Sequence, residues 1–134
     1  MKRTMTTLLC AALLTAGCSD PAPPAAPSPV APSITDTFTG TLLPLGSNSH
    51  QFVINRIGGI KVSLTAIQPG AVVGLGVGTP AQGTCIVASS ITAVAGATVQ
   101  MSGTGTILGN FCVSIADVGN LVEPVTYTIV VFHS

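Results

Sequence analysis

The sequence has little charge and few aromatic residues. Asp, Glu, Lys and Arg make up 6% of its 134 residues, whereas globular proteins usually carry about 25%. Nucleic-acid binding needs clusters of basic side chains that displace counterions from phosphates. Beyond Lys2 and Arg3 the only basic residues are Arg56 and Lys61, so we exclude DNA and RNA as partners. Aromatic residues make up 4% and tryptophan is absent, which argues against a sugar-stacking platform.

The sequence also lacks catalytic motifs. Histidine occurs only at positions 50 and 133, and with Asp36 and a serine these could in principle form a nucleophile-base-acid set. No Gly-x-Ser-x-Gly motif is present, and His133, as the penultimate residue, is expected to fray. The glycine-rich run Gly74 to Gly78 does not end in the Gly-Lys-Ser/Thr of a phosphate loop. We therefore expect no enzymatic activity and no cofactor.

One loop offers oxygen ligands for a metal ion. Asp117, Asn120 and Glu123 lie close together in the sequence, and calcium prefers oxygen ligands in such loops. EF-hand spacing is absent, and solvated turn residues are the preferred interpretation. The three residues are weak candidates for a metal site.

The chain begins with the pattern of an export signal. Lys2 and Arg3 precede an apolar stretch from Met5 to Ala16, which is shorter than the roughly 20 residues of a membrane span. The stretch Leu14-Thr15-Ala16-Gly17-Cys18 resembles the lipobox of bacterial lipoproteins, although Thr15 stands where Leu is usual. The resemblance implies removal of residues 1–17 and lipidation of Cys18. The alternative is an ordinary signal peptide cleaved nearby, with Cys18 incidental.

The resemblance also suggests a location. Ser19, rather than Asp, follows Cys18, and this resembles the signal for outer-membrane delivery in many Gram-negative bacteria. We expect a lipid-anchored cell-envelope protein, in the outer membrane rather than the inner one.

The remaining cysteines form a pair. Of the four in the chain, Cys10 lies in the leader and Cys18 would carry lipid, which leaves Cys85 and Cys112. An oxidising compartment favours a disulfide between them. Two free buried thiols or a metal site are the alternatives, but two cysteines without nearby histidines make a poor zinc site.

A proline-rich linker precedes the folded part of the chain. Residues 18–33 contain six prolines interleaved mainly with alanines, and proline fixes φ and removes a backbone donor. In extended form its span is on the order of 45 Å, enough to hold a domain away from a membrane. The domain is expected to comprise residues 34–134.

From Ile34 onward, period-2 alternation of apolar and polar residues predicts β-strands. It is clearest over 61–66, 97–102, 110–115 and 125–131, and the expected breakers include Gly58-Gly59, Pro80 to Gly83, and Gly103 to Gly105. About eight short antiparallel strands separated by turns predict an all-β sandwich of jelly-roll or immunoglobulin-like type.

Glycines alternate with apolar residues in the run from Val73 to Gly78. Leu75 and Val77 should point inward, leaving Gly74, Gly76 and Gly78 as a bare stripe on the opposite face. Glycine in a strand marks close approach of another backbone or a ligand. The preferred interpretation is a strand covered by a neighbouring loop.

Three stretches resemble the bacterial pre-peptidase C-terminal domain, a small β-sandwich. They are His50 to Ile54, Gly109 to Ile115, and Tyr127 to Val131. The acidic turn that often precedes the first aromatic strand of that family is replaced here by Ser47-Asn48-Ser49, so calcium binding does not carry over. The resemblance implies a non-catalytic binding, folding or targeting accessory.

Together these features predict a non-enzymatic, lipid-anchored envelope module that binds or presents another molecule. An envelope protein or a polysaccharide would be its partner, and the membrane would be reached through the N-terminal lipid. The first alternative is a structural subunit or stabiliser of a larger envelope complex, and a hydrolase is a distant one.

Overall fold

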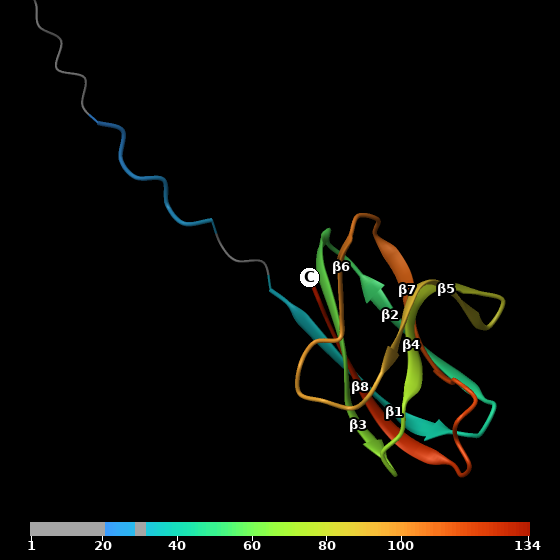
Figure 1. Cartoon of the computed structure of the whole chain (residues 1–134). Helices are drawn as coiled ribbons and strands as arrows, with labels where there is room; N and C mark the ends of the chain where they lie inside the picture. Colours follow the sequence, from blue (N-terminus) through green and yellow to red (C-terminus); the bar gives the residue numbers. More distant parts are fainter. Residues whose placement is uncertain (1–20, 29–31) are drawn as a thin grey trace, which may run out of the picture.

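The chain folds into two antiparallel four-stranded sheets packed face to face (Figure 1). The structure is a computed structural model and describes residues 21–28 and 32–134. Sheet I contains, in spatial order, β1 (Ile34–Leu42), β8 (Val125–His133), β3 (Gly58–Gln68) and β6 (Met101–Gly105). Sheet II contains β2 (Ser47–Ile54), β7 (Gly109–Asp117), β4 (Val73–Ala81) and β5 (Thr84–Ala93). The predicted eight-stranded all-β sandwich is confirmed.

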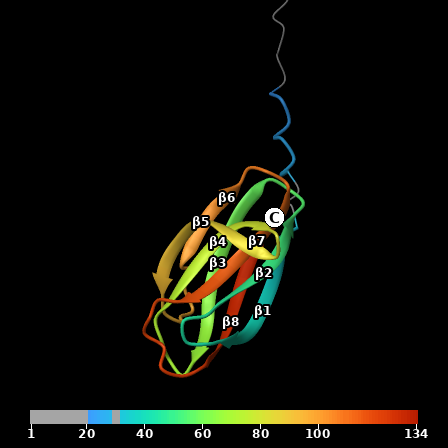
Figure 2. The same ribbon diagram turned by 90° about the vertical axis from the view of Figure 1, so that its right-hand side faces the viewer.

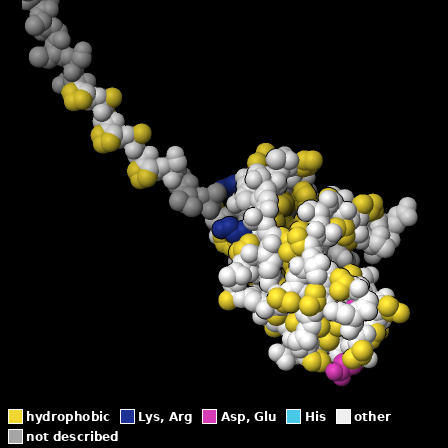
Figure 3. All heavy atoms as spheres, in the orientation of Figure 1, with side chains coloured by type: hydrophobic (Ala, Val, Ile, Leu, Met, Phe, Trp, Pro, Cys, Tyr) yellow, Lys and Arg dark blue, Asp and Glu magenta, His cyan; other side chains and the backbone are white. Residues whose placement is uncertain are grey.

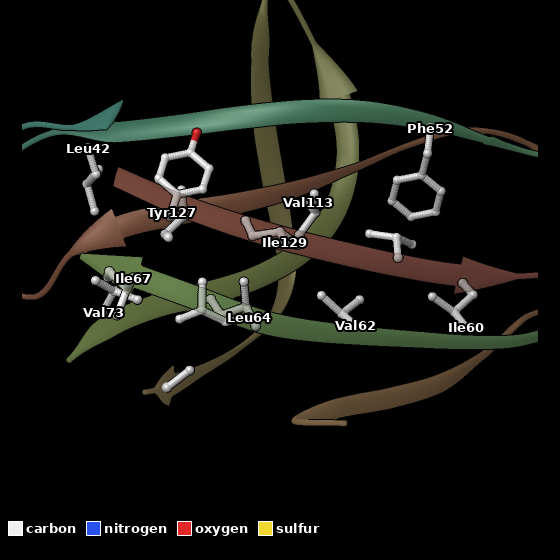
Figure 4. Close-up of a cluster of buried hydrophobic side chains, with 14 of the residues drawn as sticks. Leu42, Phe52, Ile60, Val62, Leu64, Ile67, Val73, Val113, Tyr127 and Ile129 are labelled. Atoms are coloured by element: carbon white, nitrogen blue, oxygen red, sulfur yellow. The ribbon is translucent and has the colours of Figure 1, made fainter. Parts of the chain in front are cut away.

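The core lies between the sheets and is built from the alternating apolar positions. In β8 the side chains of Val125, Tyr127, Ile129 and Val131 are buried, while Thr126 and Phe132 face solvent. Figure 4 shows the inward side chains of β8 meeting those of β3 and of sheet II. A two-residue period places every second side chain on one face of a strand, so the sequence pattern produces a one-sided core.

Each sheet has two edge strands, and these define two sides of the sandwich (Figure 2). On one side β1 of sheet I lies beside β2 of sheet II, and the two are in contact. On the other side the edges are β6 and β5. We call these the β1/β2 side and the β5/β6 side.

Several expected breakers lie inside strands. Gly58 and Gly59 begin β3, Gly103 and Gly105 belong to β6, and Pro80 lies in β4. Gly58 and Gly105, which pair with each other, are strand positions with little room for a side chain. A Cβ on Gly58 would meet Ser134 Cβ at 2.6 Å, and one on Gly105 would meet Ile54 Cδ1 at 3.0 Å. Here glycine marks close packing inside a strand rather than a turn.

The strand predicted over 97–102 is mostly wrong, because β6 begins only at Met101. The preceding segment is irregular, and the Gln100 side chain supplies the hydrogen bonds that a strand would make to β3. Its Oε1 accepts from the Leu64 N–H, while its Nε2 donates to the Leu64 carbonyl at 3.2 Å and to the Val94 carbonyl at 2.8 Å. A side-chain amide carries both a donor and an acceptor, so it satisfies the β3 backbone where β6 does not reach.

Residues 21–28 are exposed and contain no helix or strand, as their prolines predict. The first strand begins at Ile34. The expected signal peptide (1–17), Cys18 and part of the linker lie outside the described residues. Over the ranges 21–28 and 32–134, no helix has the length and apolar character needed to cross a membrane.

Candidate functional site

The disulfide predicted between Cys85 and Cys112 is present, with an S–S distance of 2.02 Å. It joins β5 to β7, two strands that are separated in sheet II by β4. Their Cα atoms are 5.8 Å apart, although strands two places apart in a flat sheet lie about 9.5 Å apart. The start of β5 therefore curls over β4 towards β7, and Cys112 is buried beneath it.

The glycine stripe of β4 makes room for this crossing. A Cβ on Gly78 would lie 1.8 Å from the Ile86 carbonyl oxygen, and one on Gly76 would lie 2.7 Å from a Val87 methyl. The register between β4 and β5 shifts at the same place, between Val77 and Gly78. Strand β5 thus covers Gly76 and Gly78, and only glycine permits so close an approach of backbone. Gly74 is covered instead by the loop after β7, where a Cβ would lie 3.5 Å from a Val118 methyl.

A polar cluster fills the β1/β2 side. Tyr127 is buried, but its hydroxyl reaches out of the core towards β2 (Figure 4). Its Oη lies 2.8 Å from His50 Nε2 and accepts a hydrogen bond from Asn48 Nδ2 at 3.1 Å. Because Asn48 occupies the acceptor, the Tyr127 O–H can donate to a neutral His50. His50 also stacks on Phe38, with ring centroids 4.9 Å apart.

Burial acts on both titratable groups of this cluster. Desolvation lowers the pKa of His50 below its ordinary value, because burial disfavours the imidazolium form. Desolvation likewise raises the pKa of Tyr127, against a smaller opposite effect of the Asn48 hydrogen bond. Both shifts favour the neutral forms that the hydrogen-bond network requires.

His133 does not fray, contrary to expectation. Its side chain is 1% exposed, since β8 is flanked by β1 and β3 as far as this residue. Its Nε2 lies 3.0 Å from Asp36 Oδ2, and its Nδ1 has no hydrogen-bond partner within the described residues. The two histidines thus have separate partners: Asp36 contacts His133, while His50 contacts Tyr127. The expectation of no enzymatic activity stays a prediction.

The candidate metal residues lie at the end of β7 and in the loop that follows it. The carboxylate of Asp117 accepts hydrogen bonds from the backbone N–H groups of Leu45 (2.8 Å), Gly119 (2.8 Å), Asn120 (3.0 Å) and Leu121 (3.2 Å). These bonds, that of Leu45 first, lower the pKa of Asp117. The carboxylate orders two loops, and no group of three His, Cys, Asp or Glu side chains suited to a metal occurs in the described ranges.

The β5/β6 side carries an apolar cleft that no pattern in the sequence predicts. Its volume is about 250 Å³. Its apolar lining includes Ile60 and Val62 of β3, Val77 of β4, Met101 of β6 and Phe111 of β7. Residues 101–107 line it without interruption, so the backbone of β6 borders the cleft. Hydrophobic side chains reach the surface between β6 and β5 (Figure 3).

Small residues keep this cleft open. Gly103 pairs with Ile60 and therefore shares its inward face, and a Cβ there would meet nothing within 4 Å. Ala88 and Ser89 line the opposite wall on β5. Gly103 and Gly105 are the signal in the sequence, although their pattern alone predicts a turn.

The outer face of sheet I is rich in threonine. A shallow depression there is lined by Thr39, Thr41, Thr126, Thr128 and the backbone around Gly40. It offers hydroxyl groups but no exposed aromatic ring among its lining residues.

Comparison of the sequence with known protein families and with curated proteins yields no match. The fold and the geometry of the two sides are therefore the basis for the function proposed below.

Proposed function

We propose that the protein is a non-enzymatic, lipid-anchored module of the cell envelope whose sandwich binds an extended segment of another envelope protein. The cleft on the β5/β6 side is the main support for this function. It combines apolar walls with the backbone of an edge strand.

A polypeptide strand suits the chemistry of this cleft. In the described chain, β5 and β6 each pair with a neighbour on one side only. An edge strand presents free N–H and C=O groups that an added strand can bind, while pockets take up alternate side chains. A polysaccharide would fit the cleft poorly, because the only polar side chains in its lining are a few Ser and Thr. It could instead use the hydroxyl-lined depression on sheet I.

A glycine pair gives a matched test. Gly103→Val places a side chain in the cleft, whereas Gly59→Val places one on the outer face of the adjacent strand, and a Cβ at either position meets nothing within 4 Å. The full chain would be crosslinked in its native membrane and recovered by affinity. We expect one stoichiometric polypeptide partner, lost with Gly103→Val and retained with Gly59→Val. Equal recovery with both variants, or recovery of polysaccharide alone, would overturn the assignment of the cleft.

The anchor is tested separately. The lipobox-like stretch ending at Cys18 and the proline-rich linker after it support lipidation of this residue. Metabolic labelling with a fatty-acid analogue should mark the protein, and Cys18→Ser should abolish the label. Label that survives the substitution would contradict the anchor and, with it, the outer-membrane location.

A structural subunit of a larger envelope complex is the alternative function. Unpaired edge strands and exposed apolar residues such as Ile86 and Val87 on β5 favour it. The resemblance of β2, β7 and β8 to strands of the pre-peptidase C-terminal domain also supports an accessory role. A partner that cannot be dissociated without unfolding this chain would favour the subunit over the binding module.

A further inference from the structure

Two loops cross between the sheets side by side at one end of the sandwich. Residues 55–57 join β2 to β3, and residues 106–108 join β6 to β7. Their flanking residues are register partners on both sheets: Ile54 pairs with Gly109, and Gly58 pairs with Gly105. The loops must therefore lie next to each other. We call them the linker-end loops.

The linker enters the domain at this same end. Ile34, the first residue of β1, pairs with His133, which in turn pairs with Ile60 near the start of β3. The linker-end loops therefore lie at the end of the sandwich where β1 begins (Figure 1).

The linker-end loops carry exposed apolar side chains beside the basic ones. Ile107 is 70% exposed, Ile57 62% and Leu108 56%. Arg56 lies in the first loop, and Lys61 follows on β3, where its Nζ sits 5.8 Å from the centre of the Phe132 ring. Arg56 and Lys61 are the two Lys or Arg residues of the described chain. Aliphatic side chains next to cations suit the interface of an anionic bilayer.

The opposite end has the opposite charge. Asp117 ends β7, and Glu123 lies in the loop between β7 and β8. Figure 3 shows acidic side chains at the end away from the Lys and Arg side chains. Leu45 and Val122 are highly exposed at the acidic end, and no Lys or Arg accompanies them in the described ranges. The remaining acid, Asp36, lies towards the linker end but contacts His133. Charge thus distinguishes two ends that are both partly apolar.

We propose that the linker-end loops dock on the surface of an anionic lipid bilayer. This inference rests on the proposed anchor, because a tether of this length holds the domain at a high local concentration near the membrane and a weak contact then suffices. Near such a surface each cation strengthens binding by about fivefold. The linker would limit how far the domain can move away instead of holding it at a fixed distance.

The mature chain, lipidated at Cys18 and held in nanodiscs that contain a gadolinium-chelating lipid, provides the test. Methyl relaxation is measured in discs rich in phosphatidylglycerol and in discs of phosphatidylcholine only. We expect strong enhancement at Ile57, Ile107 and Leu108 in the anionic discs, little at Leu45 and Val122, and loss of the difference in high salt because the contact is screened.

Variants at the two ends make the comparison specific. Arg56→Ser should lower the docking equilibrium constant by about fivefold and reduce the enhancement at Ile107 through the smaller docked population. Ile107→Ser with Leu108→Ser should abolish docking. Leu45→Ser with Val122→Ser, the matched pair at the far end, should change nothing. Equal relaxation at both ends, or a stronger effect at Val122, would overturn the inference. Failure of the anchor is distinguishable from failure of docking. Without the anchor, Cys18 would carry no lipid and the chain would not associate with the discs through it.

Discussion

The two sides of the sandwich, each formed by one edge strand of each sheet, are filled in different ways. On the β1/β2 side, inward positions carry Phe38, Asn48 and His50, and these side chains close the gap around the Tyr127 hydroxyl. On the β5/β6 side, the corresponding lining includes Gly103, Ala88 and Ser89, and a cleft of about 250 Å³ remains. The first side is closed by paired polar groups, whereas on the second side the edge strand β5 is linked covalently to β7.

This difference indicates which side is available for binding. A closed side whose polar groups are already satisfied gains little from a partner, because new contacts must replace existing hydrogen bonds. An apolar cleft next to an unpaired edge gains both apolar burial and hydrogen bonds when it is filled. Four changes, from the largest expected effect to the smallest, test this contrast.

Removal of the disulfide should have the largest effect. With a sequence separation of 27 between the cysteines, replacement of Cys85 and Cys112 by Ser should cost about 3.5 kcal/mol in the chain-entropy model. Urea unfolding measures the loss. Hydrogen exchange should rise first in β5, on the open side, and leave β1 and β2 protected. Uniform loss of protection in both sheets would show that the two sides are not held independently.

Gly78→Ala should come next. Its Cβ would lie 1.8 Å from the Ile86 carbonyl oxygen, so β5 must move, and overpacking of this kind costs up to about 3 kcal/mol. Gly59→Ala is the control, with no atom within 4 Å of the new methyl group. Equal unfolding midpoints for the two variants would contradict the close crossing of β5 over β4.

Tyr127→Phe should destabilise the closed side by about 1–2 kcal/mol, because Asn48 and His50 both lose their shared partner. Thermal and urea unfolding measure this change. The cleft on the other side should be unaffected, so binding through it should persist in this variant. An unchanged stability would mean that the Tyr127 hydroxyl does not close the β1/β2 side.

Acidification should have the smallest effect. Burial lowers the pKa of His50 in the folded protein below its ordinary value of 6.5, so the unfolded chain takes up a proton first as the pH falls. Stability should therefore decrease as the pH drops from 6.5 towards the lowered pKa of His50 and then level off. Urea midpoints between pH 8 and pH 5 measure it, and His50→Gln should remove this part of the decrease. A larger slope in the variant would contradict the sign.

Much of the fold follows directly from the sequence. Alternation over 110–115 and 125–131 predicted β7 and β8, and the even pair of cysteines predicted the disulfide. The errors concern residues whose role depends on distant neighbours. Gly103 and Gly105 have the pattern of turn residues but belong to β6. The 97–102 segment has the alternation of a strand, but before Met101 it is the Gln100 side chain, and not a paired strand, that hydrogen-bonds the backbone of β3 at Leu64.

The candidate site was harder to predict than the fold. His133 was expected to fray because it is nearly terminal, yet pairing on both sides of β8 buries it. The cleft was not anticipated because it lies between β5 and β6, the free edges of two different sheets. Local patterns contain no information on which edges face each other.

The sequence by itself determined most of the strands, their buried faces and the choice of Cys85 and Cys112, because side-chain alternation and cysteine number are local properties. Only the tertiary structure decided that β5 crosses over the glycines of β4, that Tyr127 closes one side, and that the other side stays open. These outcomes depend on which strands become neighbours. Strand order is fixed by packing two whole sheets together, which no single segment specifies.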